Sequence, residues 1–215
     1  MPRESATGRQ ARVVRLTDRL RQIYPDAHCE LNYSNPLELL VATILSAQCT
    51  DKQVNLVTTA LFQKYRSAAD YANASLSELA EDIRRIGLFR NKARFMRSAC
   101  RTLVDQHGGR VPADLAALTA LDGVGRKTAN VVLGNAFGIH SGIVVDTHVA
   151  RLAGRLRLST AKSPEAIELD LQRLVPSADW VLFSHWLIWH GRRRCRARNP
   201  DCGGCELREA CPFPD

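Results

Sequence analysis

Hydrophobic positions recur at helical spacing along most of the chain. Between residues 13 and 24, the apolar side chains of Val13, Leu16, Leu20 and Ile23 return every three or four positions, and a proline follows. This period places them on one face of an α-helix that ends before the proline. The same reasoning predicts helices over residues 36–47, 51–65, 76–86, 92–107, 112–120, 127–137, 165–175 and 178–190.

Short polar residues mark where several of these helices begin. Ser, Thr and Asp side chains accept hydrogen bonds from the free N–H groups of a first turn. The candidate caps are Thr50 or Asp51, Ser75, Ser163 and Ser177. Residues 36–47 form an apolar run that starts with proline, so we expect a buried helix at the centre of the protein. Only residues 142–145 resemble a strand, which is too short to found a sheet, and the predicted fold class is all-α.

Composition and charge narrow the class of protein. With 215 residues, 45% of them hydrophobic, the chain suffices for one compact domain or two small lobes. Thirty Lys and Arg residues against 22 Asp and Glu residues point to a polyanionic partner. Residues 1–12 are polar and basic, so we expect a mobile tail there, and the run 37–47 is too short to span a bilayer. A cytoplasmic protein with no membrane partner is expected.

The segment from Leu121 to Ala129 has the form of a helix-hairpin-helix. Gly123 and Gly125 lie in the turn between a predicted short helix and an apolar-rich one. Glycine can take positive φ and has no side chain, so a DNA strand can approach the backbone N–H groups at the second helix's N-terminus. The predicted phosphate contacts are Gly123, Val124, Gly125, Arg126 and Thr128. A tight turn that binds nothing is the alternative.

Four cysteines near the C-terminus suggest a metal centre. Cys195, Cys202, Cys205 and Cys211 are separated by six, two and five residues. This compact run favours an iron–sulfur cluster held by four thiolates, because zinc sites usually show two C-x-x-C pairs around a longer insert. Zinc and disulfides remain alternatives. The other cysteines, Cys29, Cys49 and Cys100, lie in apolar or helical contexts and are expected to be reduced core residues.

A run of arginines surrounds the first of the four cysteines. Its members are Arg192, Arg193, Arg194, Arg196 and Arg198. The loop that binds the metal centre would therefore carry a basic surface toward phosphate. The alternative is an ordinary solvated charge run.

Lys127 and Asp146 form a candidate catalytic pair. Lys127 begins the second helix of the hairpin, where its amine can serve as a nucleophile. Asp146 follows a short apolar run and precedes a predicted helix, so its alternative role is that of an N-cap. A carboxylate facing the same cavity as Lys127 could stabilise positive charge that develops on a sugar.

The hairpin with its lysine, the Val145-Asp146-Thr147-His148 segment and the four cysteines resemble the endonuclease III family of bifunctional DNA glycosylases and AP lyases. The resemblance extends from about residue 13 to the C-terminus. It implies two helical lobes that flank a cleft. One would be a six-helix barrel over residues 31–140, and the other would comprise residues 13–30 and 141–215 with a [4Fe-4S] cluster on the four cysteines.

The same resemblance implies roles for individual residues. Lys127 would be the nucleophile and Asp146 its essential carboxylate, with His148 close to the DNA. Gln48 would enter the space left by a flipped base, and Leu88 would wedge against the opposite strand. From the residues alone, Gln48 is equally a polar residue at a helix end, and Leu88 equally a core leucine.

These observations predict a monomeric base-excision-repair enzyme that acts on double-stranded DNA with damaged pyrimidines or abasic sites. It would remove oxidised pyrimidines through a lysine Schiff base and cut the strand by β-elimination. Two alternatives stay open. Adenine-specific mismatch glycosylases resemble this chain but lack a lysine at the Lys127 position, and a non-catalytic, metal-stabilised DNA-binding module would need neither Lys127 nor Asp146. Residues 86–93 weakly repeat the hairpin pattern, which suggests a second loop that faces DNA.

Overall fold

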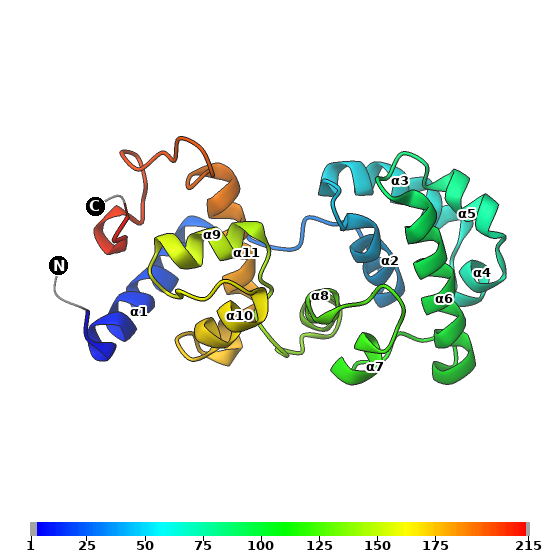
Figure 1. The fold of residues 1–215 in the computed structure, drawn as a ribbon, viewed down its shortest axis with the longest axis horizontal. Helices are drawn as coiled ribbons and strands as arrows, with labels where there is room; N and C mark the ends of the chain where they lie inside the picture. Colours follow the sequence, from blue (N-terminus) through cyan, green and yellow to red (C-terminus); the bar gives the residue numbers. More distant parts are fainter. Residues whose placement is uncertain (1–3, 214–215) are drawn as a thin grey trace. The chain divides into compact units, whose positions relative to one another are not determined.

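The computed structural model describes residues 4–213, and the regular secondary structure in that range consists of helices alone, with no β-strand (Figure 1). The all-α prediction is confirmed, and residues 142–145 form no strand. The chain divides into unit 1, Met1–His28 with Gly142–Asp215, and unit 2, Cys29–Ser141. None of the described helices is long and apolar enough to cross a bilayer.

Unit 2 contains seven α-helices, one more than the barrel expected from the resemblance. They are α2 Pro36–Ser46, α3 Asp51–Lys64, α4 Ala68–Asn73, α5 Leu76–Asp82, α6 Phe89–His107, α7 Leu115–Thr119 and α8 Arg126–Phe137. The sequence analysis missed α4, because six residues are too few to show an apolar period. Its start is fixed by a capping box in which Ser67 and Asp70 each bond the other's backbone N–H.

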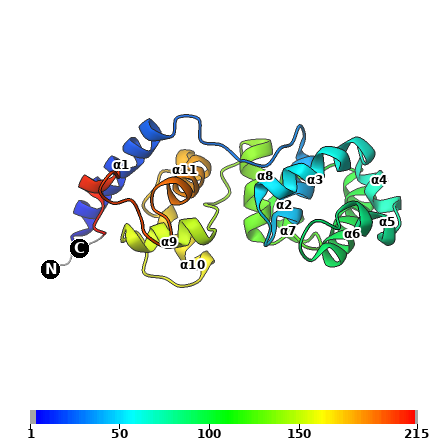
Figure 2. The same cartoon turned by 90° about the horizontal axis from the view of Figure 1, so that it is seen from above.

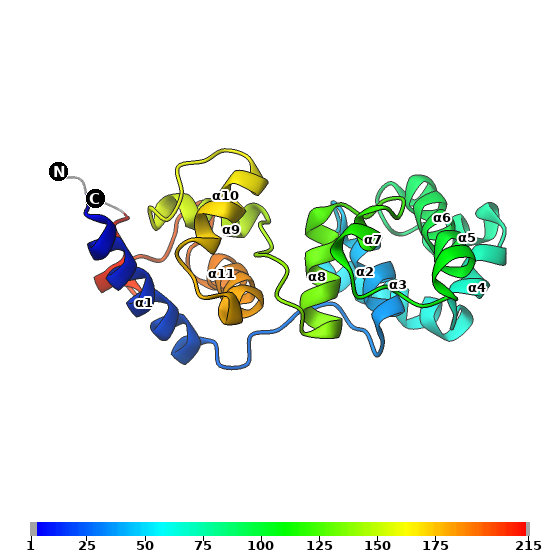
Figure 3. The same ribbon diagram turned by 90° about the horizontal axis from the view of Figure 1, so that it is seen from below.

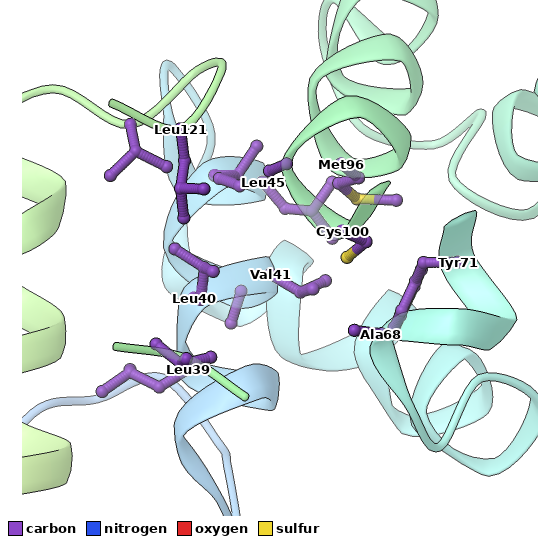
Figure 4. Packing of buried hydrophobic residues seen from close by; sticks show 14 of the residues in the cluster. Leu39, Leu40, Val41, Leu45, Ala68, Tyr71, Met96, Cys100 and Leu121 are labelled. Atoms are coloured by element: carbon purple, nitrogen blue, oxygen red, sulfur yellow. The ribbon is translucent and has the colours of Figure 1, made fainter. Parts of the chain in front are cut away.

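The core of unit 2 is built around α2, which lies between α6 and α8 and also packs on α3 (Figures 1 and 3). Leu39, Leu40 and Leu45 are fully buried, which confirms the expected central helix. In the close view, Val41 and Leu45 of α2 face the side of α6 that carries Met96 and Cys100 (Figure 4). This packing keeps the two ends of α2, and the loops that follow them, in fixed positions.

A buried lysine joins α2 to α6. The Lys92 ammonium group donates hydrogen bonds to the carbonyl oxygens of Leu45 at 2.8 Å and Ala47 at 2.6 Å, at the C-terminal end of α2. Burial lowers the pKa of Lys92. The predicted repeat of the hairpin in residues 86–93 therefore differs from the hairpin itself, because its lysine points into the protein and satisfies carbonyl groups that α2 leaves unpaired.

Unit 1 is a bundle around α11. Its elements are α1 Ala6–Ile23, α9 Thr147–Arg155, α10 Pro164–Gln172, α11 Trp180–Arg193, and the 3-10 turns η1 Ser177–Asp179 and η2 Arg208–Ala210. The helix α11 packs against α1 and α9, with Trp186 and Phe183 fully buried, and η2 lies against α1 (Figure 2). The N-caps predicted at Thr50, Ser75 and Ser163 are present in the two units.

The expected mobile tail is wrong for residues 5–12. Ser5 caps α1 by accepting a hydrogen bond from the Gly8 N–H, and the helix then runs without a break into the predicted one. Arg12 is buried, bonds both carboxylate oxygens of Glu4 and donates to the Leu156 carbonyl oxygen at 2.8 Å. These contacts fix the segment. Residues 1–3 of the predicted tail lie outside the described residues.

Candidate active site and cysteine cavity

The hairpin turn between α7 and α8 uses its two glycines differently. Gly123 has φ +76°, in the left-handed region, and a Cβ atom there would lie 2.7 Å from the Cβ atom of Phe95. Both the backbone and the space therefore require glycine at this position. Gly125 has φ −84° and ψ 173°, and a Cβ atom there would meet nothing within 4 Å. The turn therefore uses the conformational freedom of glycine at Gly123 and only the absence of a side chain at Gly125.

The N-terminus of α8 is built to leave backbone donors available. Gly125 is the N-cap residue, and no side chain accepts from the first turn at the cap. Val124 is buried and anchors the turn in the core of unit 2, whereas Lys127 in the first turn is exposed. A helix N-terminus without a side-chain cap can attract an anion, and the amine of Lys127 lies in the first turn of this one.

Gln48 and Leu88 both have left-handed backbone conformations, with φ 53° and φ 58°, and both are exposed. Leu88 is 57% exposed, so the alternative of a core leucine is wrong. Left-handed conformations are strained for non-glycine residues and recur at functional sites. Lys92 holds these two segments together. It lies near the start of α6, whose N-cap residue is Leu88, and its ammonium group donates to carbonyl oxygens at the end of α2, just before Gln48.

Asp146 is the N-cap of α9, as the alternative reading stated. Its Oδ1 accepts hydrogen bonds from the N–H groups of His148 and Val149, both at 2.8 Å. Its Oδ2 receives no hydrogen bond from any residue between 4 and 213, and the side chain is half-buried. The N–H of Val144 donates to Ser184 Oγ at 2.9 Å, and this bond holds the segment that precedes Asp146 against α11. One oxygen thus caps the helix while the other stays available for chemistry.

Two arginines of α9 support the cysteine loop, and the sequence analysis missed them. Arg151 donates to the carbonyl oxygens of Gly191 and Cys195, both at 3.0 Å, and lies 3.2 Å from His148 Nδ1. Arg155 donates to Cys195 Sγ at 3.2 Å and to the carbonyl oxygens of the next two residues at 2.7 and 3.0 Å. Their spacing of four residues, which puts them on one helix face, was the available signal.

The four C-terminal cysteines line one cavity in unit 1, of about 410 Å³ including space open to solvent, together with Arg155, His190 and Phe213. All four are free thiols and half-buried. The Leu207 N–H donates to Cys205 Sγ at 3.4 Å, and burial raises the pKa of the Cys205 and Cys211 thiols. Within residues 4–213, no three His, Cys, Asp or Glu side chains are placed to hold a single metal ion.

The arginine run is only partly a basic surface open to a ligand. Arg194 forms ion pairs with Asp201 at 2.8 Å and Glu206 at 2.9 Å, so it folds the cysteine loop instead of facing phosphate. The guanidinium of Arg193 lies 3.9 Å from the ring centroid of Trp189. The other members of the run, Arg192, Arg196 and Arg198, are exposed. The difference from the expected basic surface arises because the loop folds back and brings Asp201 and Glu206 against Arg194.

The predicted site residues thus fall into two groups. Unit 2 carries the hairpin, Lys127, Gln48 and Leu88. Unit 1 carries Asp146, His148, the cysteine cavity and the arginine run. Of the three remaining cysteines, Cys100 is buried in the core of unit 2 as expected, whereas Cys29 and Cys49 are only partly buried against that core.

Comparison with known proteins identifies the family. Residues 41–177 match the family model of the HhH-GPD superfamily base excision DNA repair proteins. Endonuclease III of Synechocystis sp. is 52% identical over 193 residues, which cover 90% of this chain and 88% of the relative. A non-covalent endonuclease III–DNA complex and a trapped endonuclease III–DNA covalent intermediate each superpose with a TM-score of 0.90 at 46% identity, and cover 94% of this chain and 95% of theirs. The chain therefore belongs to the endonuclease III family of base excision repair DNA glycosylases.

Proposed function

We propose that this chain removes oxidised pyrimidines from duplex DNA and then cuts the strand at the abasic site, with Lys127 as the nucleophile. The carrying observation is the exposed amine of Lys127 in the first turn of a helix whose N-terminus has no side-chain cap. A phosphate bound at that N-terminus would hold the sugar–phosphate backbone beside the amine. The solved covalent endonuclease III–DNA intermediate supports attack by the protein on DNA in a relative.

The chemistry follows from what the two groups can do. The Lys127 amine attacks the sugar C1′, and the damaged base leaves with the electron pair of the glycosidic bond. The nitrogen loses one proton, which the departing base can take up. The sugar ring then opens as O4′ leaves C1′ with the electron pair of their bond and is protonated, so a protonated Schiff base remains. This iminium acidifies the C2′ proton, so β-elimination breaks the C3′–O bond on the 3′ side. The Asp146 carboxylate would stabilise the positive charge that develops on the sugar.

A base inside a duplex must leave the stack before its C1′ can be attacked. We propose that Gln48 occupies the space that the base leaves and that Leu88 wedges against the opposite strand. Both residues are exposed and have left-handed backbone conformations, which supports these roles. In addition, the apolar side chain of Leu88 is presented to solvent, which suits insertion between bases. Oxidised pyrimidines that stack weakly would cost less to extract.

Borohydride trapping tests the proposed function. Reduction of the Schiff base should give a covalent protein–DNA adduct with duplex containing an abasic site or an oxidised pyrimidine, but none with undamaged duplex. An adenine-specific enzyme without an amine nucleophile would excise adenine and give no adduct. Binding without excision or adduct would instead indicate a non-catalytic module. We expect the protein to act as a monomer on DNA in the cytoplasm.

The four cysteines fit an iron–sulfur cluster, and we propose [4Fe-4S] as the resident cofactor. Four half-buried thiols share one cavity, and Arg155, at 3.2 Å from Cys195 Sγ, supplies the kind of donor that stabilises cluster sulfurs. When bound, the cluster would cross-link the loop from Cys195 to Cys211 and so fix the exposed arginines beside it. Arg194 holds the same loop through its ion pairs with Asp201 and Glu206.

Purified protein should be brown and contain about four irons per chain. Cys202→Ser should lower the iron content and the folding yield or DNA affinity, and should change the chemical step at saturating enzyme far less, because no reacting group is removed. Cys49→Ser makes the same change at a half-buried cysteine outside the cavity and should keep full iron content. A colourless protein with stoichiometric zinc would contradict the assignment.

Gly125→Ala should weaken DNA binding with only a small loss of stability, since alanine is a poorer N-cap than glycine. A methyl group meets nothing in the protein at this position and φ is ordinary, so the only obstacle it presents is to a strand approaching the N-terminus of α8. The measurement is fluorescence anisotropy with a duplex containing an abasic-site analogue, over a range of salt concentrations, alongside thermal unfolding.

Gly123→Ala is the paired control and should behave differently. Its positive φ and the close Phe95 side chain should cost on the order of 1–3 kcal/mol of stability and lower the melting temperature. If Gly125→Ala bound as tightly as the unmodified protein at every salt concentration, the hairpin would not be the DNA anchor.

A further inference from the structure

A basic groove lies beside the hairpin in unit 2. It encloses about 1260 Å³, including space open to solvent. One wall is the face of α6 that carries Arg94, Arg97 and Arg101, and the other is the chain from Ala72 to Leu76. Asp122 of the hairpin segment is the only acidic residue in its lining. We call this feature the arginine groove.

The three arginines stand at positions i, i+3 and i+7 of α6, which puts them on one helix face. None of them forms an ion pair with a residue between 4 and 213, and their one hydrogen bond in that range runs from Arg101 to the Ala72 carbonyl oxygen at 3.3 Å. Elsewhere in unit 2, Lys64 and Arg84 do pair with nearby carboxylates. Like charges on one face repel each other, so binding of an anion in the groove would be electrostatically favourable.

The single carboxylate of the groove, that of Asp122, does not balance the charge of the three arginines. Asp122 accepts a hydrogen bond from the Ser98 hydroxyl group, which ties the hairpin to α6. Phe95, 43% exposed, lies directly against Gly123. The groove and the hairpin turn therefore share a wall, so a ligand that leaves the turn in this direction reaches the arginines next.

The dimensions suit a nucleic-acid strand. Seven residues of helix separate Arg94 from Arg101, a span of about 10 Å. One strand of a duplex rises about 3.4 Å along the helix axis per phosphate, and its successive phosphates lie about 7 Å apart, so the span matches two neighbouring phosphates. Guanidinium groups are the preferred partners of such phosphates.

We propose that the arginine groove binds the phosphate backbone of one DNA strand beyond the hairpin contact. The inference rests on the proposed function in taking DNA as the ligand. The groove would lengthen the DNA footprint on unit 2 without reading base sequence, because contacts from guanidinium groups to phosphates carry no sequence information. Arg94 and Arg97 would make contacts that the hairpin itself does not supply.

The test combines Arg94→Gln with Arg97→Gln and measures how DNA affinity depends on salt. Each phosphate contact contributes about 0.9 to the slope of log affinity against log salt, so the double variant should lose about 2 from that slope on a long duplex with an abasic-site analogue. The duplex is then shortened from one end or the other. Only one of the truncations, the one that removes DNA from the groove, should abolish the difference between the two proteins.

Arg66→Gln combined with Arg110→Gln removes the same charge from exposed positions of unit 2 outside the groove. This control should leave the truncation pattern of the unmodified protein. Because Arg97 is half-buried, melting temperatures are compared, and Arg94→Gln alone should lose about half of the slope change even if the double variant folds poorly.

Failure of this proposal is separable from failure of the proposed function. Absence of borohydride trapping by the unmodified protein would overturn the function. Normal trapping, with equal slopes for the double variant and the unmodified protein on every duplex, would overturn the groove as a DNA contact. The groove proposal would also be overturned if the Arg66→Gln and Arg110→Gln control lost the same slope as the double variant. Calorimetry showing that the double variant loses binding of inorganic phosphate but keeps its binding of DNA would overturn it as well.

Discussion

Lys127→Gln should reduce borohydride trapping and strand cleavage to background while abasic-site binding stays close to that of the unmodified protein. Glutamine keeps a polar side chain of similar length in the first turn of α8, but it has no amine to form a Schiff base. The Lys127 side chain is exposed, so the substitution should leave the stability of the fold unchanged. Trapping yields and single-turnover cleavage on abasic duplex, with binding followed by anisotropy, measure the effect.

Lys52→Gln provides a matched control. Lys52 is also exposed and also the second residue of a helix, α3, but that helix has the Thr50 side chain as its cap. This variant should trap as the unmodified protein does. Persistent trapping by Lys127→Gln would move the nucleophile to another amine.

Asp146→Asn should lower base excision by about a hundredfold or more, with an unchanged melting temperature. The amide oxygen can still accept the hydrogen bonds from His148 and Val149, so the cap of α9 survives, whereas the negative charge that opposes a developing cation is lost. Single-turnover excision of an oxidised pyrimidine from duplex DNA measures the chemical step.

Asp114→Asn makes the same change at another aspartate cap, that of α7, where Oδ1 accepts from the Ala117 N–H at 2.8 Å. Excision by this variant should be normal. If Asp146→Asn excised at a normal rate with an unchanged melting temperature, Asp146 would be a helix cap and nothing more.

The elements that could be predicted from sequence are those set by neighbouring residues. Ser75, Ser163 and Thr50 cap the helices that follow them, because capping needs only a side chain and the next turn. The start of α1 at Ala6 has the same local signal, because Ser5 caps it, but the apolar period that indicates a helix begins only at Val13. Its anchor is the bond from Arg12 to the Leu156 carbonyl oxygen, which joins residues 144 positions apart.

The candidate site shows the same division. The identities of Lys127, Asp146 and the four cysteines follow from short motifs, but the exposure of Leu88 does not, since leucines are usually buried. The pairing of Arg194 with Asp201 and Glu206 depends on how the loop folds back on itself. Lys92 and Lys127 occupy similar local patterns and have opposite surroundings, one buried beneath α2 and one exposed.

The hydrogen bonds from Arg151 and Arg155 to Cys195 have a consequence for how the enzyme matures. Both arginines belong to α9, the helix that Asp146 caps. The carboxylate therefore lies at the start of this short helix, and the first cysteine is bonded to its later turns. If the cysteines hold iron as proposed, loading the metal steadies that helix, and a chain without iron keeps it by hydrogen bonds alone. Iron supply would then set how many copies in a cell are ready to begin repair.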